Sequence, residues 1–179
     1  MKPQKLILII GPPASGKTTL ARKLEADLNM PVMGTDDIKE RICTALDIKD
    51  DAHWSDKLNE ACYDLLLFFA QRFLRHGSSL ILESDFRYED SEKIAGLTSG
   101  IGVTQVLLEV DHKLILERFK ARWHKGERHP AQADNLWFED LEKGPTTGTR
   151  FLQIEGERIA IDATSEATLN YQGLLERLS

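Results

Sequence analysis

The eight residues 11–18, Gly-Pro-Pro-Ala-Ser-Gly-Lys-Thr, constrain the fold of this chain more than any other segment. They have the spacing G-x-x-x-x-G-K-S/T of a phosphate-binding loop, and the apolar run 6–10 comes directly before them. A buried strand that enters a helix through a glycine-rich turn points backbone N–H groups at an anion, at the positive end of the helix. An ordinary glycine turn is the alternative, but all four specified positions seldom occur together by chance. The motif therefore predicts a site for nucleotide phosphates.

The positions of this loop have different predicted roles. Gly11 and Gly16 allow backbone angles and close approaches that a side chain would block. Lys17 is expected to reach the β- and γ-phosphates and to take part in catalysis, and the Thr18 hydroxyl is expected to bind Mg²⁺. The complete predicted nucleotide-binding set in this segment is Gly11, Pro12, Pro13, Ala14, Ser15, Gly16, Lys17, Thr18 and Thr19.

Composition limits the class of protein and of partner. The chain has 179 residues, of which 41% are hydrophobic and 29% charged, and a net charge of −6. Polynucleotide-binding proteins usually have a basic excess, so a nucleic-acid partner is disfavoured. Cys43 and Cys62 lack metal-type spacing, which predicts buried thiols in a reducing compartment. Because no stretch approaches the roughly 20 apolar residues of a membrane span, we expect one cytoplasmic domain over 1–179, without a membrane partner. The sequence does not indicate an oligomeric state.

Apolar runs and amphipathic segments alternate along the chain, which predicts a parallel sheet covered by helices on both faces. The expected strands are about 5–10, 32–34, 80–82, 103–110 and 159–161. The expected helices are about 16–28, 35–46, 55–76, 89–95, 112–123 and 165–178. Residues 125–149 are polar and rich in Gly and Pro, which predicts a lid-like segment that buries little surface.

Two adjacent aspartates follow the second expected strand. Ligands of open α/β sheets bind outside the carboxyl ends of the strands. Asp36 is therefore expected to face the γ-phosphate and to accept the proton of an attacking hydroxyl, and Asp37 is the alternative base. Aspartate is also favoured at helix N-caps, so one of the two, or Thr35, is expected to cap the next helix. Both aspartates are candidate contacts of the phosphoryl acceptor.

Charged residues also follow the third expected strand. Glu83 stands where a carboxylate can hold Mg²⁺ through water, so Thr18 and Glu83 are the predicted metal-binding residues. Asp85 and Arg87 are predicted to contact the acceptor. The alternative is a strand end with solvated charges.

Three arginines are candidates for stabilising the transferring phosphoryl group. Arg118 and Arg122 are four residues apart and share one helix face, and Arg128 lies in the lid-like segment. Cationic groups that close over the phosphoryl group stabilise its negative charge. We expect Arg118 and Arg122 to bind the nucleotide, and Arg122 and Arg128 to act in catalysis. A solvated helix face is the alternative for each of them.

The chain resembles the small P-loop kinases. That group includes gluconate kinase, chloramphenicol phosphotransferase, zeta-toxin kinases, the kinase domain of polynucleotide kinases and AAA-domain P-loop kinases of bacteria. The resemblance spans nearly the whole chain and is carried by 11–18, 35–39, 81–87 and 128–130. It implies a P-loop NTPase fold, a three-layer α/β/α arrangement with a five-stranded parallel sheet in the order 2-3-1-4-5. It also implies ATP and Mg²⁺ as cofactors, with Asp36 as the base and Lys39 as a basic acceptor contact.

The predicted function is transfer of the γ-phosphate of ATP to a hydroxyl of a small-molecule acceptor. The sequence departs from the pattern of the group at Lys39, Asp85 and Ala131, where arginine, asparagine and glycine are expected. These positions concern the acceptor and the lid. The alternatives are a 5′-hydroxyl polynucleotide kinase, a nucleotide-sugar kinase, and a nucleotide-gated ATPase switch without an acceptor.

Overall fold

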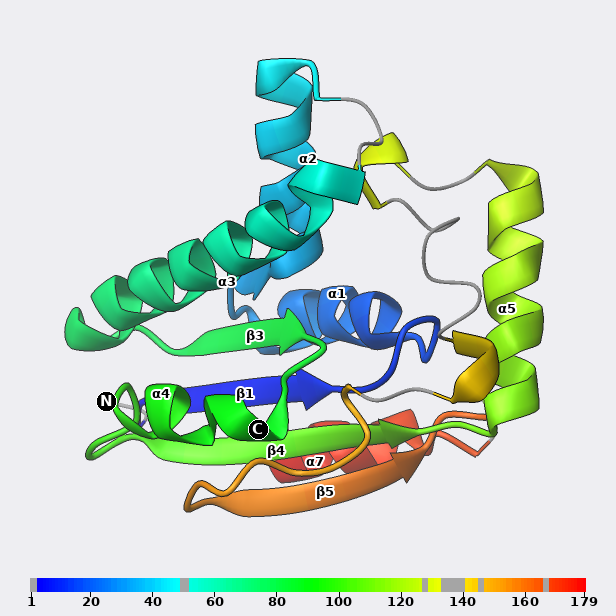
Figure 1. Cartoon of the computed structure of the whole chain (residues 1–179). Coiled ribbons are helices and arrows are strands. Elements are labelled where there is room, and N and C mark those ends of the chain that lie inside the picture. Colours follow the sequence, from blue (N-terminus) through cyan, green and yellow to red (C-terminus); the bar gives the residue numbers. More distant parts are fainter. Residues whose placement is uncertain (1–2, 49–51, 127–128, 133–140, 145–146, 166–167) are drawn as a thin grey trace.

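The computed structural model describes residues 3–48, 52–126, 129–132, 141–144, 147–165 and 168–179. Its strands form one parallel sheet in the order β2-β3-β1-β4-β5, as the resemblance to small P-loop kinases implies (Figure 1). The strands are β1 (Lys5–Ile10), β2 (Val32–Gly34), β3 (Leu80–Ser84), β4 (Gly102–Glu109) and β5 (Glu157–Asp162). Ile10 pairs with Ser84 of β3 and Leu107 of β4, so these strands end at the same edge of the sheet.

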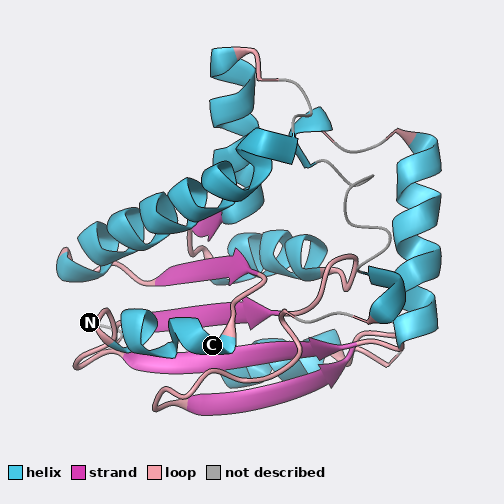
Figure 2. Ribbon diagram, in the orientation of Figure 1, coloured by secondary structure: helices cyan, strands magenta, loops and turns pink. Residues whose placement is uncertain are grey.

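Helices cover both faces of the sheet (Figures 1 and 2). The helices are α1 (Lys17–Leu28), α2 (Thr35–Leu46), α3 (Ala52–Arg75), α4 (Ser91–Ala95), α5 (His112–Lys125) and α7 (Tyr171–Leu178). Two short 3-10 turns are η1 (Tyr88–Asp90) and η2 (Pro130–Gln132). Apolar residues of α1 and α7 share one core cluster, and those of α3 and α4 share another. The predicted three-layer α/β/α arrangement is therefore confirmed.

The central strand β1 explains why the sequence shows an unbroken apolar run before the phosphate loop. Leu6 and Leu8 pack into the cluster with α3, whereas Ile7 and Ile9 pack into the cluster with α1 and α7. A parallel strand that is buried on both faces has no polar alternation. Both sets of side chains on this strand must therefore be apolar.

The predicted start of the second helix is wrong in one respect. Neither aspartate caps α2, because its N-cap is Gly34, in an extended conformation and without a side-chain cap. The strand β2 runs directly into the helix, so Asp36 and Asp37 lie in the first turn. Acidic residues there still interact favourably with the positive end of the helix.

Two further helix starts differ from the predictions. The third helix begins at Ala52 and not at Ser55. The last helix begins at Tyr171 and not at Ser165. The hydroxyls of Ser165 and Thr168 hydrogen-bond neighbouring backbone N–H groups, which favours a turn over a helix. Asn170 caps the helix instead, because its side chain accepts from the Gly173 N–H.

Residues 147–154, which we call the strap, cross the core before β5. Gln105 of β4 is fully buried and accepts from the Leu152 N–H at 2.8 Å. Its amide also donates to the carbonyls of Leu152 and Ile154, at 3.4 and 3.5 Å. The Gln153 N–H donates to Ser91 Oγ at 3.0 Å. The strap is thus held by side chains of β4 and α4 and not by strand pairing.

No helix within the described ranges has the length and apolarity that crossing a membrane requires.

We expect Gln105→Leu to lower the free energy of unfolding by about 1–3 kcal/mol, because the Leu152 N–H loses its acceptor inside the core. Urea denaturation followed by circular dichroism measures this change. Gln153→Ala, which alters an exposed side chain of the strap, is the control and should change stability by less than about 0.5 kcal/mol. Equal midpoints for the two variants would show that apolar packing alone holds the strap.

Candidate active site

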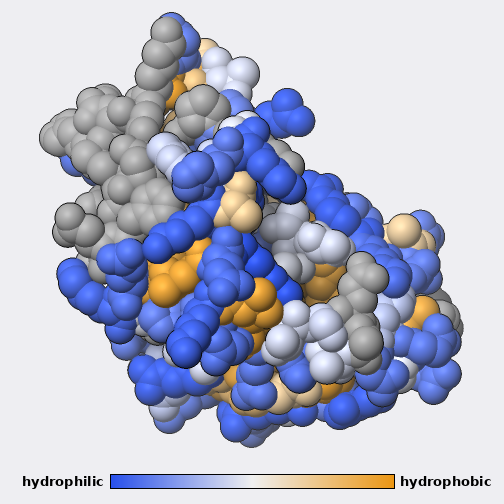
Figure 3. All heavy atoms as spheres, turned by 90° about the vertical axis from the view of Figure 1, so that its right-hand side faces the viewer, coloured by the Kyte–Doolittle hydropathy of each residue, from blue (hydrophilic) through white to orange (hydrophobic). Residues whose placement is uncertain are grey.

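The phosphate loop, 11–18, lies at the carboxyl edge of the sheet between β1 and α1 (Figure 1). Figure 3 views the molecule from this side, where the described surface is mostly hydrophilic with separate apolar patches. Gly16 is the N-cap of α1 at φ 98°, and no side chain caps the helix. Ala14 also has a positive φ, of 61°. The loop therefore adopts a strained backbone that leaves the first N–H groups of α1 without a side-chain cap.

The loop also contains a buried hydroxyl that suits a phosphate ligand. Ser15 is 2% exposed, and among the described residues nothing hydrogen-bonds its Oγ. Burying a polar group in this way costs about 1–3 kcal/mol, which a phosphate oxygen would recover by accepting from the hydroxyl. A Cβ at Gly11 would lie 2.5 Å from Ser15 Oγ, so a side chain there would displace this hydroxyl. These features fit the predicted nucleotide phosphates.

Lys17 is 8% exposed, and its ammonium is held by two oxygen atoms. Its Nζ donates to the Pro12 carbonyl at 3.0 Å and lies 2.7 Å from Asp85 Oδ1. The structure therefore pairs Asp85, a predicted acceptor contact, with the lysine of the loop. An ammonium group has three donors, so the two observed bonds leave one N–H for a phosphate oxygen.

The predicted metal-binding residues are adjacent. Thr18 Oγ1 donates to Glu83 Oε1 at 3.2 Å, and Glu83 is 6% exposed. A Cβ at Gly34 would lie 2.9 Å from Glu83 Oε2, so this glycine leaves room for the carboxylate. Thr18 and Glu83 supply the hard oxygen atoms that Mg²⁺ prefers, and Mg²⁺ usually adds phosphates and waters to one or two carboxylates. Among the described residues, no group of three or more His, Cys, Asp or Glu side chains could hold a metal ion.

Burial raises the pKa of Glu83 from 4.5 to about 7. The charges of Asp36 and Asp85 act in the same direction, whereas the charge of Lys17 and the Thr18 hydrogen bond lower the pKa. Of the acidic residues predicted for the phosphate site, Asp36 and Asp85 therefore lie close enough to act on Glu83. Near neutral pH it is present both as the acid and as the carboxylate.

The two candidate bases, Asp36 and Asp37, have different surroundings. Both carboxylate oxygens of Asp37 accept from one Arg22 nitrogen, at 2.9 and 2.7 Å, on the surface between α1 and α2. The charge of Asp36 instead acts on Glu83 and on Cys62 of α3. Of the two, Asp36 thus acts electrostatically on the Thr18–Glu83 pair, whereas Asp37 lies beside Arg22 on the surface. Arg22 was not predicted, although it lies four residues after Thr18 on the same helix.

Lys39 and Arg87, the two predicted basic acceptor contacts, differ in burial. Lys39 is 4% exposed, and its charge opposes the burial that raises the pKa of the Cys43 and Cys62 thiols. It therefore lies where α2 packs on α3. Arg87 is exposed, and its backbone N–H donates to Asp90 at 3.1 Å. Cys43 and Cys62 are buried free thiols, as predicted.

The structure separates the two arginines of α5. Arg118 donates to the Ala163 carbonyl at 3.2 Å and to the Thr164 carbonyl at 2.7 Å, in the loop after β5. Arg122 lies over the Phe119 ring, 5.4 Å from its centroid. Arg118 is therefore not merely solvated, and its contacts are with backbone. Arg128, the third candidate, lies outside the described residues.

The described parts of the predicted lid, 125–149, bury more surface than expected. His129 and Gln132 hydrogen-bond side chains of α2 at 3.1 and 3.0 Å. Leu141 packs into an apolar cluster on α5. Each of these parts thus packs on a helix that directly follows a strand, α2 after β2 and α5 after β4. The polar composition of this segment gave no indication of these contacts in the sequence.

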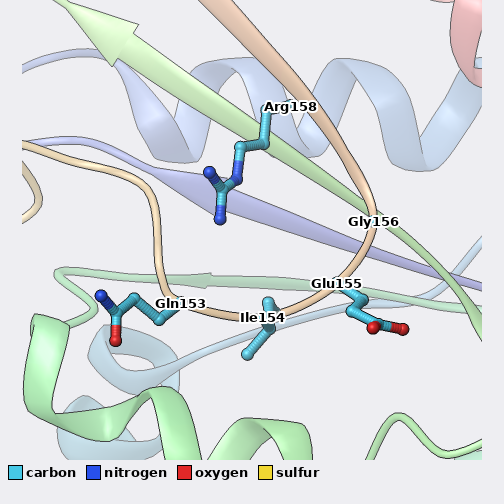
Figure 4. Close-up of a pocket in the computed structure, with 5 residues that line it drawn as sticks. All are labelled: Gln153, Ile154, Glu155, Gly156 and Arg158. Carbon is cyan, nitrogen blue, oxygen red and sulfur yellow. The ribbon is translucent and has the colours of Figure 1, made fainter.

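A hollow of about 510 Å³ lies elsewhere, at the turn before β5 (Figure 4). Its lining residues are Gln153, Ile154, Glu155, Gly156 and Arg158. No predicted site residue lines it, and it lies at the amino end of β5, whereas the phosphate loop follows the carboxyl end of β1.

A family model described as an AAA domain matches residues 6–143. No curated protein matches the chain. A candidate kinase of known structure from Chloroflexus aurantiacus is 28% identical, with a TM-score of 0.88 over 99% of this chain and 97% of that chain. A sugar kinase from Janibacter is 19% identical, with a TM-score of 0.61 over 98% and 92% of the two chains. A gluconokinase from Sinorhizobium meliloti is 17% identical, with a TM-score of 0.53 over 98% and 95%. These matches confirm the predicted resemblance to small P-loop kinases.

We expect Glu83→Gln to stabilise the protein at high pH but not below about pH 4.5. The folded protein holds the proton of Glu83 with a pKa of about 7, whereas the ordinary value is 4.5. Folding therefore favours the protonated form, and the wild type loses stability as the pH rises from about 4.5 to 7. Above that range the loss is about 3 kcal/mol.

Thermal unfolding of both proteins between about pH 4 and pH 9 measures this difference. The exposed Glu92→Gln is the control and should leave the curve unchanged. A stability difference between Glu83→Gln and the wild type that does not vary with pH would contradict the assigned environment of Glu83.

Proposed function

This chain belongs to the AAA-domain family, and on that basis we propose that it transfers the γ-phosphate of ATP to a hydroxyl of a small-molecule acceptor. The observation that carries the proposal is the cluster of Lys17, Thr18 and Glu83 at the carboxyl edge of the sheet. A cation, a hydroxyl and a carboxylate stand there beside uncapped helix N–H groups. This is the donor set that phosphoryl transfer requires.

The phosphate loop would bind and orient the nucleotide. The first N–H groups of α1 and the Ser15 hydroxyl would donate to phosphate oxygens. The remaining N–H of Lys17 would do the same on the side of the γ-phosphate, where negative charge is redistributed during transfer. Thr18 and Glu83 would hold Mg²⁺, which supplies charge neutralisation when it is bound.

Asp36 would act as the general base toward the acceptor. Its carboxylate would accept the proton of the attacking hydroxyl as the hydroxyl oxygen forms its bond to the γ-phosphorus and the bond to the departing ADP breaks. Asp36 suits this role because its charge acts on Glu83 within the cluster, whereas Asp37 lies on the surface beside Arg22. Lys39, buried one turn further along α2, would bind the acceptor from the same helix.

The acidic character of the chain supports a small acceptor. A net charge of −6 disfavours the extended basic surface that a polynucleotide needs. We therefore propose a cytoplasmic enzyme whose partner is a small molecule and neither nucleic acid nor a membrane. An acceptor-free ATPase switch remains the alternative, and the acceptor dependence of ATP turnover separates the two.

We expect the wild type to consume ATP faster in the presence of one member of a panel of sugars, nucleosides and nucleotide sugars. Lys17→Ala should lower this turnover at least about tenfold, or roughly 1.4 kcal/mol in transition-state terms, because a cation at the phosphates is lost. ADP release measures the rate, and binding of ATP is measured separately by calorimetry. Unchanged binding and turnover in this variant would contradict the nucleotide site.

We expect Asp36→Asn to bind ATP normally and to lose about 10²–10⁴-fold in acceptor phosphorylation, because the general base is removed. Asp37→Asn is the matched control, since it changes the neighbouring carboxylate in the same helical turn and should lose much less. The phosphorylated product is quantified by mass spectrometry. Wild-type rates in the Asp36 variant would place the base elsewhere.

A further inference from the structure

Gly148 of the strap lies directly against the phosphate loop. It is buried and has a φ of +67°. A Cβ at this position would overlap the carbonyl group of Gly11 and would lie 2.9 Å from the Pro12 nitrogen. The Gly148 N–H donates to the Phe86 carbonyl at 3.4 Å. One residue thus touches both the phosphate loop and the loop after β3.

The rest of the strap is held by residues of β4, α4 and η1. Gln105 and Ser91 hold the backbone of Leu152 and Gln153, at 2.8 and 3.0 Å. The guanidinium of Arg150 lies 4.2 Å from the centroid of the Tyr88 ring. The strap is therefore a fixed backing for the residues that rest on it, and Gly148 is its point of contact with the phosphate loop.

The two loops that Gly148 touches are the same two that hold Lys17. Pro12, whose nitrogen faces Gly148, supplies the carbonyl that accepts from Lys17 at 3.0 Å. Asp85, which lies 2.7 Å from Lys17 Nζ, precedes Phe86. We propose that Gly148 is a positioning residue of the phosphate site, which fixes the separation of these loops and so the place of the Lys17 ammonium. The catalytic consequence rests on the proposed kinase function.

A side chain at Gly148 would meet two obstacles, and one of them can be tested separately. A positive φ disfavours every residue with a Cβ, and the overlap with Gly11 adds a displacement of the loop. Gly100 has a similar φ of +76°, and a Cβ there would find nothing within 4 Å. Gly100→Ala therefore carries the backbone strain of Gly148→Ala without the overlap, and it lies at the opposite edge of the sheet.

The first test does not depend on ATP. Hydrogen exchange in the backbone amides of Gly11, Ala14, Ser15 and Gly16 should be at least about tenfold faster in Gly148→Ala than in Gly100→Ala, because opening of the loop becomes easier. Equal exchange in the two variants would overturn the proposal. If Gly148→Ala does not fold, Arg150→Ala replaces it. Arg150 is exposed, and its loss should loosen the strap and raise the same exchange.

The second test compares catalysis between variants that are equally well folded. Gly148→Ala should lower the kcat of ATP turnover by about 10²-fold, because misplacing a charged group near the reacting atoms has effects of that size. Gly100→Ala should keep the wild-type kcat. Equal kcat values for the two variants would overturn the positioning role. A wild type that neither binds nor consumes ATP would instead contradict the proposed function, while the exchange result would still decide whether Gly148 positions the loop.

Discussion

The buried ammonium of Lys17 is the constraint on which the rest of the site depends. A charge that is 8% exposed needs partners at hydrogen-bond distance, because leaving it unpaired in the interior costs several kcal/mol. The Pro12 carbonyl and Asp85 are those partners, and they come from two different loops. Pairing Lys17 therefore fixes the phosphate loop relative to the end of β3. Glu83, two residues before Asp85, then becomes buried beside Thr18.

The order of the strands brings these residues together. Because β1 lies beside β3, Ile10 and Ser84 are paired neighbours, and the loops that follow them leave the sheet side by side. Gly34 pairs with Glu83 across the next strand boundary, so the start of α2 reaches the same place. Thr35 and Ser84 join there through their hydroxyls at 3.1 Å. The positions of Asp36, Glu83 and Lys17 thus follow from the topology of the sheet.

Local sequence patterns predicted the features that depend on residues close together in the chain. The strands and the turn 11–18 between β1 and α1 agree with the structure. The sheet order, which came from the resemblance and not from local patterns, also agrees. The contacts of Asp85 with Lys17, and of Gly148 with Gly11, join residues far apart in sequence, so no spacing could indicate them. The predicted helix cap at Asp36, Asp37 or Thr35 was wrong for a related reason. Tertiary pairing of β2 with β3 sets where the strand ends, and so where the helix begins.

Departures from ordinary local rules gather at one edge of this sheet. Ala14 has a positive φ, the Ser15 hydroxyl is buried, and burial of Glu83 disfavours its charged form. Each of these features by itself lowers the stability of the fold. The stability of the fold gives no reason for all of them to lie within one loop and its neighbours. Proteins tolerate such costs where function requires strained or desolvated groups. The same argument applies to Gly148, which admits no side chain because the phosphate loop occupies the space. The clustering of these costs around Lys17 therefore supports a phosphate site independently of the motif from which it was first inferred.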